Sequence, residues 1–127
     1  MLYHACGVID LVDKTGIDML QLVASTDASV IDVDTQVDIS IASDRFGHDT
    51  CIRGNVNTTI LGSTYYAPER VIREIENILH ASMAGGKRYM FAAGCEWPWE
   101  PVSIVTRKLG LAKAFVARDG SYKEELH

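Results

Sequence analysis

Short apolar runs, each ended by glycine or polar residues, recur along the chain, and segments of helical periodicity separate them. Runs of this length and composition are typical of buried strands. The pattern predicts strands over residues 2–6, 29–34, 50–53 and 88–93.

Helices are predicted between these strands. The clearest begins at Pro68, because proline suits the first helical position and two successive glycines end the segment. Its apolar positions lie on one helical face and are Val71, Ile72, Ile75, Ile78 and Leu79. Thr15 followed by Asp18 resembles a capping pair, which predicts a first helix that contains Ile17 and ends near Ser25.

Two other segments complete the pattern. Residues 37–46 are ambiguous, because their apolar positions alternate as in a strand and also fit a helix that ends at Gly47. We favour a helix there because strands are predicted on both sides. A last helix is predicted from Pro101 to Gly120, with an apolar stripe of Val102, Val105, Leu109, Ala112 and Val116.

Strands that alternate with helices predict an α/β fold made of βαβ units with parallel strands. The chain contains about four such units, whereas a closed (β/α)₈ barrel, the TIM barrel, takes about 250 residues. We therefore expect a half-barrel domain over residues 1–120 and a polar tail over residues 121–127. An open half barrel would expose two sheet edges and an apolar inner face, so we expect a homodimer or a separate N-terminal half to cover them.

Composition narrows the functional classes. The 127 residues are 47% apolar and carry a formal net charge of −5, which suits one globular domain and disfavours binding to nucleic acid. No apolar run has the length that a membrane span requires, and the first residues lack the features of a signal peptide, so we expect a cytoplasmic protein. Three cysteines in that setting favour metal or thiol chemistry over disulfides.

A metal site is suggested by His4, Cys6 and Cys95. His4 and Cys6 are two residues apart, so in a strand both side chains point to the same side. Cys95 follows a distant strand, and a third ligand from far along the chain is common in catalytic zinc sites, which keep one position open. Imidazole and thiolate are ligands that zinc prefers, and Cys51, in mid-strand, is interpreted as an apolar filler.

Three more polar residues lie where functional groups of a barrel are found, at the carboxyl ends of strands. Asp34 either binds substrate or caps the next helix. Asn55 either binds substrate or turns the chain, and Glu96 either completes a metal shell or is a solvated turn residue. Trp97 and Trp99 either wall a flat cofactor or pack the barrel rim.

Four motifs, in this order, give the chain a family resemblance: His4-Ala5-Cys6-Gly7, Ile31-Asp32-Val33-Asp34 with Val37-Asp38, Arg53 to Asn57 followed by Leu61-Gly62-Ser63-Thr64 and Pro68-Glu69, and Tyr89 to Pro98. They resemble the uroporphyrinogen decarboxylase superfamily, and in detail its methylcobalamin:coenzyme M methyltransferase branch. The chain resembles the C-terminal half of such a protein, from about the fifth barrel strand onward. The stretch from residue 7 to residue 16 looks longer than the corresponding loop of the family.

The resemblance implies a zinc-dependent, corrinoid-linked methyltransferase in which His4, Cys6 and Cys95 bind zinc. Zinc would activate a small thiol such as coenzyme M, and a methylcorrinoid carried by a partner protein would be the methyl donor. The namesake decarboxylases have a histidine in the region of Cys95, which favours the methyltransferase branch. The alternatives are a uroporphyrinogen decarboxylase-type enzyme of tetrapyrrole metabolism and a truncated, non-catalytic half barrel.

Overall fold

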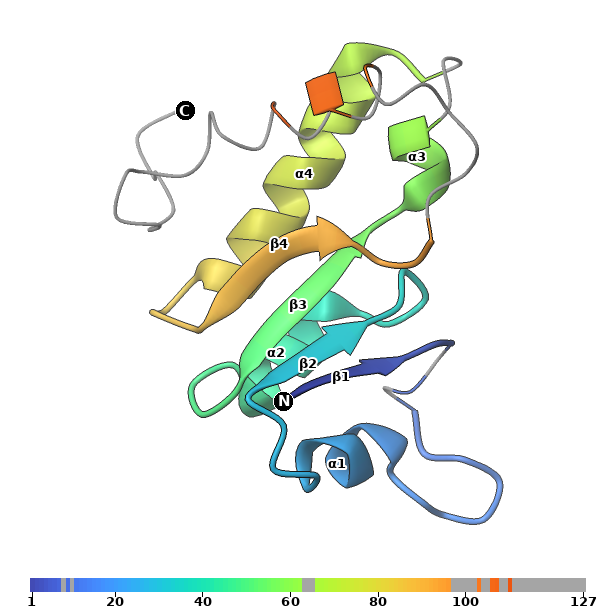
Figure 1. Ribbon diagram of the computed structural model, residues 1–127, viewed down its shortest axis with the longest axis vertical. Coiled ribbons are helices and arrows are strands. Elements are labelled where there is room, and N and C mark those ends of the chain that lie inside the picture. The colour runs from blue at the N-terminus through green and yellow to red at the C-terminus, as the bar shows by residue number, and fades with distance from the viewer. Residues whose placement is uncertain are drawn as a thin grey trace.

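Four parallel strands form a single sheet in the part of the chain that the structure, a computed structural model, describes: residues 1–7, 9, 11–62 and 66–96, with residues 103, 106, 107 and 110. The strands are β1 (Leu2–Ala5), β2 (Val30–Val33), β3 (Cys51–Val56) and β4 (Tyr89–Ala93). Each strand pairs with the next along the chain, in the order β1-β2-β3-β4 (Figure 1). Consecutive parallel strands of this kind are the arrangement found in one part of a barrel wall.

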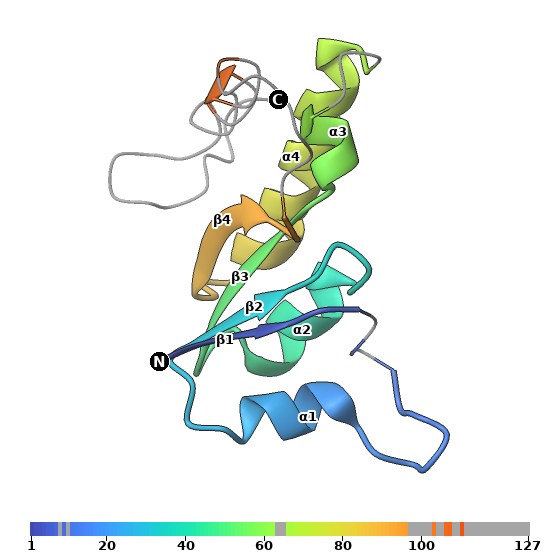
Figure 2. The ribbon, with the colours of Figure 1, turned by 45° about the vertical axis from the view of Figure 1, so that its right-hand side comes forward.

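Helices connect consecutive strands, as the alternation of patterns predicts, and one short helix is additional. They are α1 (Met19–Ala24), α2 (Ile39–Phe46), α3 (Thr58–Gly62) and α4 (Pro68–Met83). In both views α2 and α4 lie behind the sheet, and α3 sits at the carboxyl end of β3 beside α4 (Figures 1 and 2). The predicted α/β half-barrel arrangement is therefore confirmed for the described residues.

The hydrophobic core lies between the sheet and these helices. Ile31 and Ile52 project from neighbouring strands at paired positions, and both are completely buried. The helical partners are the apolar positions that the periodicity singled out, and Ile75 and Leu79 of α4 are also completely buried. Burying each of these side chains contributes roughly 1.5–3 kcal/mol, so this layer is the main source of stability in the sheet–helix unit.

The first helix begins later than predicted. Asp18, not Thr15, is its N-cap, and the Asp18 carboxylate accepts a hydrogen bond from the Gln21 amide. Thr15 instead belongs to a turn in which its amide and hydroxyl both donate to Asp13. Because the Asp13 carboxylate accepts these hydrogen bonds, the chain forms a turn before the helix starts. Ile17 therefore lies outside the helix and is 47% exposed.

Strand β3 is longer than predicted. It continues through Gly54, which has φ of +136°, to Val56. A side chain at Gly54 would place its Cβ 2.7 Å from the Val33 carbonyl oxygen, so the glycine permits close packing of β3 on β2 and does not end the strand. The short helix α3, which follows Asn57, was not predicted.

The remaining predictions have different outcomes. Residues 37–46 form a helix from Ile39, with Gly47 as its C-cap, as favoured above. The apolar stripe of the helix predicted from Pro101, the tryptophans at positions 97 and 99, and the tail at 121–127 lie outside the described residues. None of the helices in the described ranges combines the length and the hydrophobicity that a bilayer span requires.

Candidate functional site

Three potential metal ligands meet at the carboxyl edge of the sheet. Cys6 follows β1, Asp34 follows β2 and Cys95 follows β4. One ligand atom from each residue, the sulfur or a carboxylate oxygen, lies within 4.8 Å of the others. Parallel strands end at the same edge, and this places residues from three distant segments around one point.

Close packing of two loops brings Cys95 to this edge. Gly94 lies directly against Thr35, and a Cβ at Gly94 would lie 2.5 Å from the Thr35 nitrogen and 2.9 Å from its Cα. The Gly94 amide also donates to the Val56 carbonyl at 2.9 Å. Only a residue without a side chain allows the turn after β4 to approach the turn after β2 this closely.

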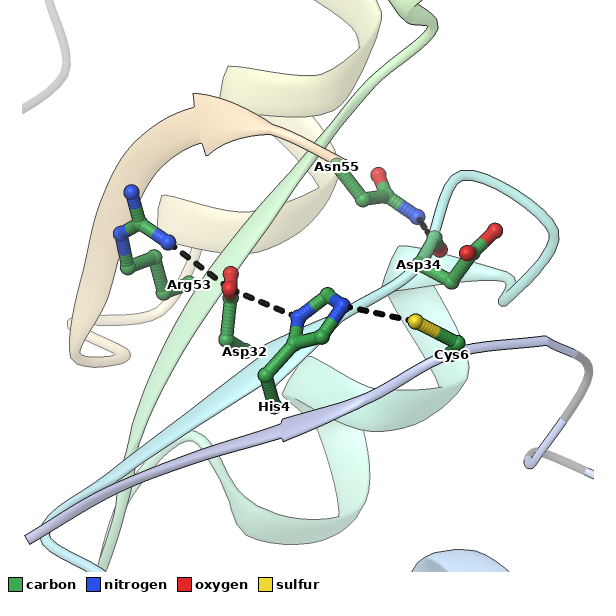
Figure 3. A network of polar contacts seen from close by, with 6 residues as sticks. All are labelled: His4, Cys6, Asp32, Asp34, Arg53 and Asn55. Carbon is green, nitrogen blue, oxygen red and sulfur yellow. Dashed lines mark hydrogen bonds and ion pairs between the residues drawn. The ribbon is translucent and has the colours of Figure 1, made fainter. Parts of the chain in front are cut away.

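Asn55 holds the loop that carries Asp34. Its amide nitrogen donates to the carbonyl oxygen of Asp34 at 3.0 Å (Figure 3). It also donates to the carbonyl oxygen of Val37 at 2.6 Å, and Asn55 itself is buried. The Asp34 carboxylate in turn accepts from the Gln36 amide at 2.9 Å. These bonds determine the course of the backbone on both sides of Asp34.

His4 joins the group through Cys6. The His4 Nε2 atom lies 3.0 Å from the Cys6 sulfur, and its Nδ1 atom lies 2.9 Å from Oδ2 of Asp32 (Figure 3). Arg53 contacts the same Asp32 oxygen through Nη1 at 2.8 Å. These residues form one row across the sheet, because His4 pairs with Asp32 in the strand register and Asp32 pairs with Arg53.

This row adds polar groups to the inner face that was expected to be apolar, a face that the exposed Leu2 and Met90 share. Residues paired across parallel strands point to the same side, so His4, Asp32 and Arg53 share the face opposite the helix-covered core residues. The sequence itself offered a sign that Asp32 and Arg53 belong to a polar site. Asp32 and Arg53 interrupt otherwise apolar strands, at the positions that share a face with Asp34 and Asn55.

The surroundings of Cys6 disfavour its thiolate form. The pKa of the Cys6 thiol is raised, first by desolvation, then by the neighbouring Cys95 and by the carboxylates of Asp34 and Glu96. The carboxylates of Asp34 and Glu96 disfavour a negative charge at the Cys6 sulfur. A bound cation would remove this repulsion.

A cavity of about 480 Å³ opens beside the group. Its lining residues are His4, Asp32, Arg53, Phe91, Ala92, Ala93, Cys95 and Glu96. The volume falls in the range of sites for small molecules, and the lining joins the candidate ligands to the polar row of the sheet. A small substrate in this cavity would therefore lie next to Cys95.

The donor set fits zinc. It combines two sulfurs and an imidazole with a carboxylate, and all four are groups that zinc accepts in tetrahedral sites. The structure brings together Cys6 and Cys95, adds His4 beside Cys6, and places Asp34 where a further ligand would stand. The predicted substrate-binding roles of Asp34, Asn55 and Glu96 stay predictions.

The other cysteine and histidines lie elsewhere. Cys51 is half-buried at the start of β3, where burial raises its thiol pKa, and it pairs with Val30 at the amino end of the sheet. His48 lies in the turn after α2, and His80 lies in the last turn of α4. None of these three residues belongs to the group of Cys6, Asp34 and Cys95 found among the described residues.

The fold and the site together define a class: part of a (β/α)₈ barrel with polar side chains at the carboxyl ends of its strands. Residues 1–104 match the family described as "Uroporphyrinogen decarboxylase (URO-D)". A protein of Shewanella pealeana named "Uroporphyrinogen decarboxylase" is 34% identical over 94 residues, which are 72% of this chain and 25% of that protein. A protein of the same name from Actinobacillus pleuropneumoniae is 33% identical over 86 residues, 68% of this chain and 23% of that protein.

The chain belongs to the uroporphyrinogen decarboxylase family, because the family match covers most of its length. It spans about a quarter of the length of the curated relatives that it matches. The family assignment agrees with the resemblance of the motifs to the uroporphyrinogen decarboxylase superfamily.

Proposed function

We propose that this chain supplies the zinc site of a corrinoid-linked methyltransferase of the uroporphyrinogen decarboxylase family, in which a small thiol accepts the methyl group. The observation that carries the proposal is the meeting of Cys6, Asp34 and Cys95 within 4.8 Å, with His4 beside Cys6. Two cysteine sulfurs, one of them 3.0 Å from an imidazole nitrogen, beside a cavity are a donor set suited to thiol activation.

The residues have distinct roles in this proposal. Cys6, Cys95 and His4 would hold the metal, and Asp34 would be the ligand that an incoming thiol replaces. Bound zinc supplies Lewis acidity, which lowers the pKa of the thiol so that its proton leaves to solvent. A methylcorrinoid on a partner protein would supply the methyl group, and the thiolate sulfur would accept it.

The test measures zinc per chain in protein purified without chelators. We expect about one zinc per chain, because the donor set makes a single site. Cys95→Ser should lose the metal, whereas the matched control Cys51→Ser should retain it, because Cys51 lies at the opposite end of the sheet. Protein with no zinc, or a Cys95→Ser variant with full zinc, would overturn the ligand assignment.

A second candidate function is favoured by the names of the relatives, which are uroporphyrinogen decarboxylases. In this candidate the cavity binds a carboxylated tetrapyrrole, and Arg53, in the cavity lining, offers a cation to one of its carboxylates. Binding of uroporphyrinogen to metal-free protein, with undiminished binding in Cys95→Ser, would support this candidate over the first.

The proposed assembly can be tested separately. β1 and β4 are the outer strands of the sheet in the described residues, and Leu2 and Met90, on these strands, are about half exposed. We propose that a second copy or an N-terminal half covers these edges, as the sequence predicts. Light scattering should then report a dimer, or a monomer that binds a separately produced N-terminal half.

A further inference from the structure

Asp32 is an unusual residue for the middle of a parallel strand. It is only 6% exposed, and both of its neighbours in the sheet register, His4 and Arg53, direct polar groups at one of its oxygens, Oδ2. Its other oxygen, Oδ1, is buried without a hydrogen-bond partner among the described residues. A carboxylate present for stability alone would be placed where both oxygens are satisfied.

The geometry determines the tautomer of His4. A carboxylate accepts hydrogen bonds and has no proton to donate, so the 2.9 Å contact requires the hydrogen to be on Nδ1 of His4. In the neutral imidazole this leaves the lone pair on Nε2. Nε2 is the atom that faces the candidate ligand Cys6, at 3.0 Å.

Arg53 acts on His4 through Asp32. Its guanidinium donates to the same Oδ2 at 2.8 Å, from the strand on the other side. The carboxylate is thus held from both sides, and the arginine cation offsets its charge in a buried position. Without Arg53 the carboxylate would be free to rotate about its bond to Cβ and to release the imidazole.

We propose that Asp32 and Arg53 form a positioning pair that locks His4 in the Nδ1–H tautomer, with Nε2 directed at the metal position. The proposal deepens the proposed function, since it rests on the same zinc site. It assigns roles to two residues that do not touch the metal. Carboxylates that orient metal-binding histidines typically change metal affinity about 10–100-fold when they are removed.

The first readout is the His4 tautomer in metal-free protein, measured from ¹⁵N chemical shifts of the imidazole. The chain has four histidines, and the His4 signal is identified by its loss in His4→Gln. We expect Nδ1–H in the native protein and a mixture with Nε2–H in Asp32→Ala. An unchanged tautomer in Asp32→Ala would overturn the proposal, whether or not the protein binds zinc.

The second readout is zinc affinity, measured by competition with a chromophoric chelator. Asp32→Ala and the nearly isosteric Asp32→Asn should bind zinc about 10–100-fold more weakly. Arg53→Gln should also weaken binding, and Arg53→Lys should restore part of the loss because it returns the cation. Native affinity in the folded Asp32→Asn and Arg53→Gln variants would overturn the proposal.

Matched controls come from ion pairs far from the site. Asp44→Asn removes a carboxylate paired with Lys87, and Arg45→Gln removes an arginine paired with Asp18. Neither should change zinc affinity or the His4 tautomer. Native protein that binds no zinc but contains the Nδ1–H tautomer would contradict the proposed function and leave the positioning of His4 intact.

Discussion

Replacement of Asn55 by alanine tests how the site is held together. The substitution removes the amide that donates to the carbonyl oxygens of Asp34 and Val37, and both residues are buried. Each carbonyl left without a donor costs about 1–3 kcal/mol, and partial access of water lowers the sum, so we expect a loss of about 2–4 kcal/mol in the free energy of unfolding. The same change frees the loop that carries Asp34.

Urea denaturation of metal-free protein in the presence of a chelator measures this loss without a contribution from bound metal. Asn77→Ala is the control, because Asn77 is exposed in the middle of α4. That variant should stay within about 0.7 kcal/mol of the native protein, with helix propensity favouring alanine. A loss below about 1 kcal/mol in Asn55→Ala would refute the reasoning that these two hydrogen bonds hold the Asp34 loop.

Three other predictions follow from the described contacts. Gly94→Ala should cost about 1–3 kcal/mol and weaken zinc binding, because the new methyl group meets the Thr35 backbone; native affinity, measured by chelator competition, would contradict this. Hydrogen peroxide should oxidise Cys6 and Cys95 to a disulfide with release of two waters, so that free thiols fall from three to one, whereas zinc-loaded protein should resist; loss of Cys51 instead would count against it. The pKa of Asp38 is lowered by hydrogen bonds from the Ser40 hydroxyl and amide, so its contribution to stability is present above the ordinary value of 3.8 and is lost as the pH falls below it. Asp38→Asn should therefore reduce the acid dependence of the urea midpoint, and an unchanged dependence would disprove this.

The spacing of residues along the chain predicted only part of the candidate metal site. A His-x-Cys pair predicts two side chains on one side of a strand, and His4 and Cys6 do lie in contact. Nothing local to Cys95 predicts its partner. Its position beside Cys6 depends on the strand order and on the packing of Gly94 against Thr35, both of which join segments far apart in the chain.

Local sequence patterns also placed the ends of a helix and a strand wrongly. The capping pair at Thr15 and Asp18 has the right spacing, but Asp13 takes the Thr15 amide and hydroxyl, so the helix starts after Asp18. At Gly54 the sequence suggests a strand end, yet the strand continues because close approach to Val33 favours glycine there.

The sequence by itself determined the alternation of strands and helices, the buried face of α4, the family and the candidate ligands His4, Cys6 and Cys95. These features depend on periodicity and on short motifs, which neighbouring residues specify. Only the tertiary structure decided that Asp34 stands beside the two cysteines and that Asp32 links His4 to Arg53. Those contacts depend on strand order and register, which are set by packing across the whole sheet. Asp32 and Arg53 stand out as charged residues in their strands, but no single segment shows that they pair.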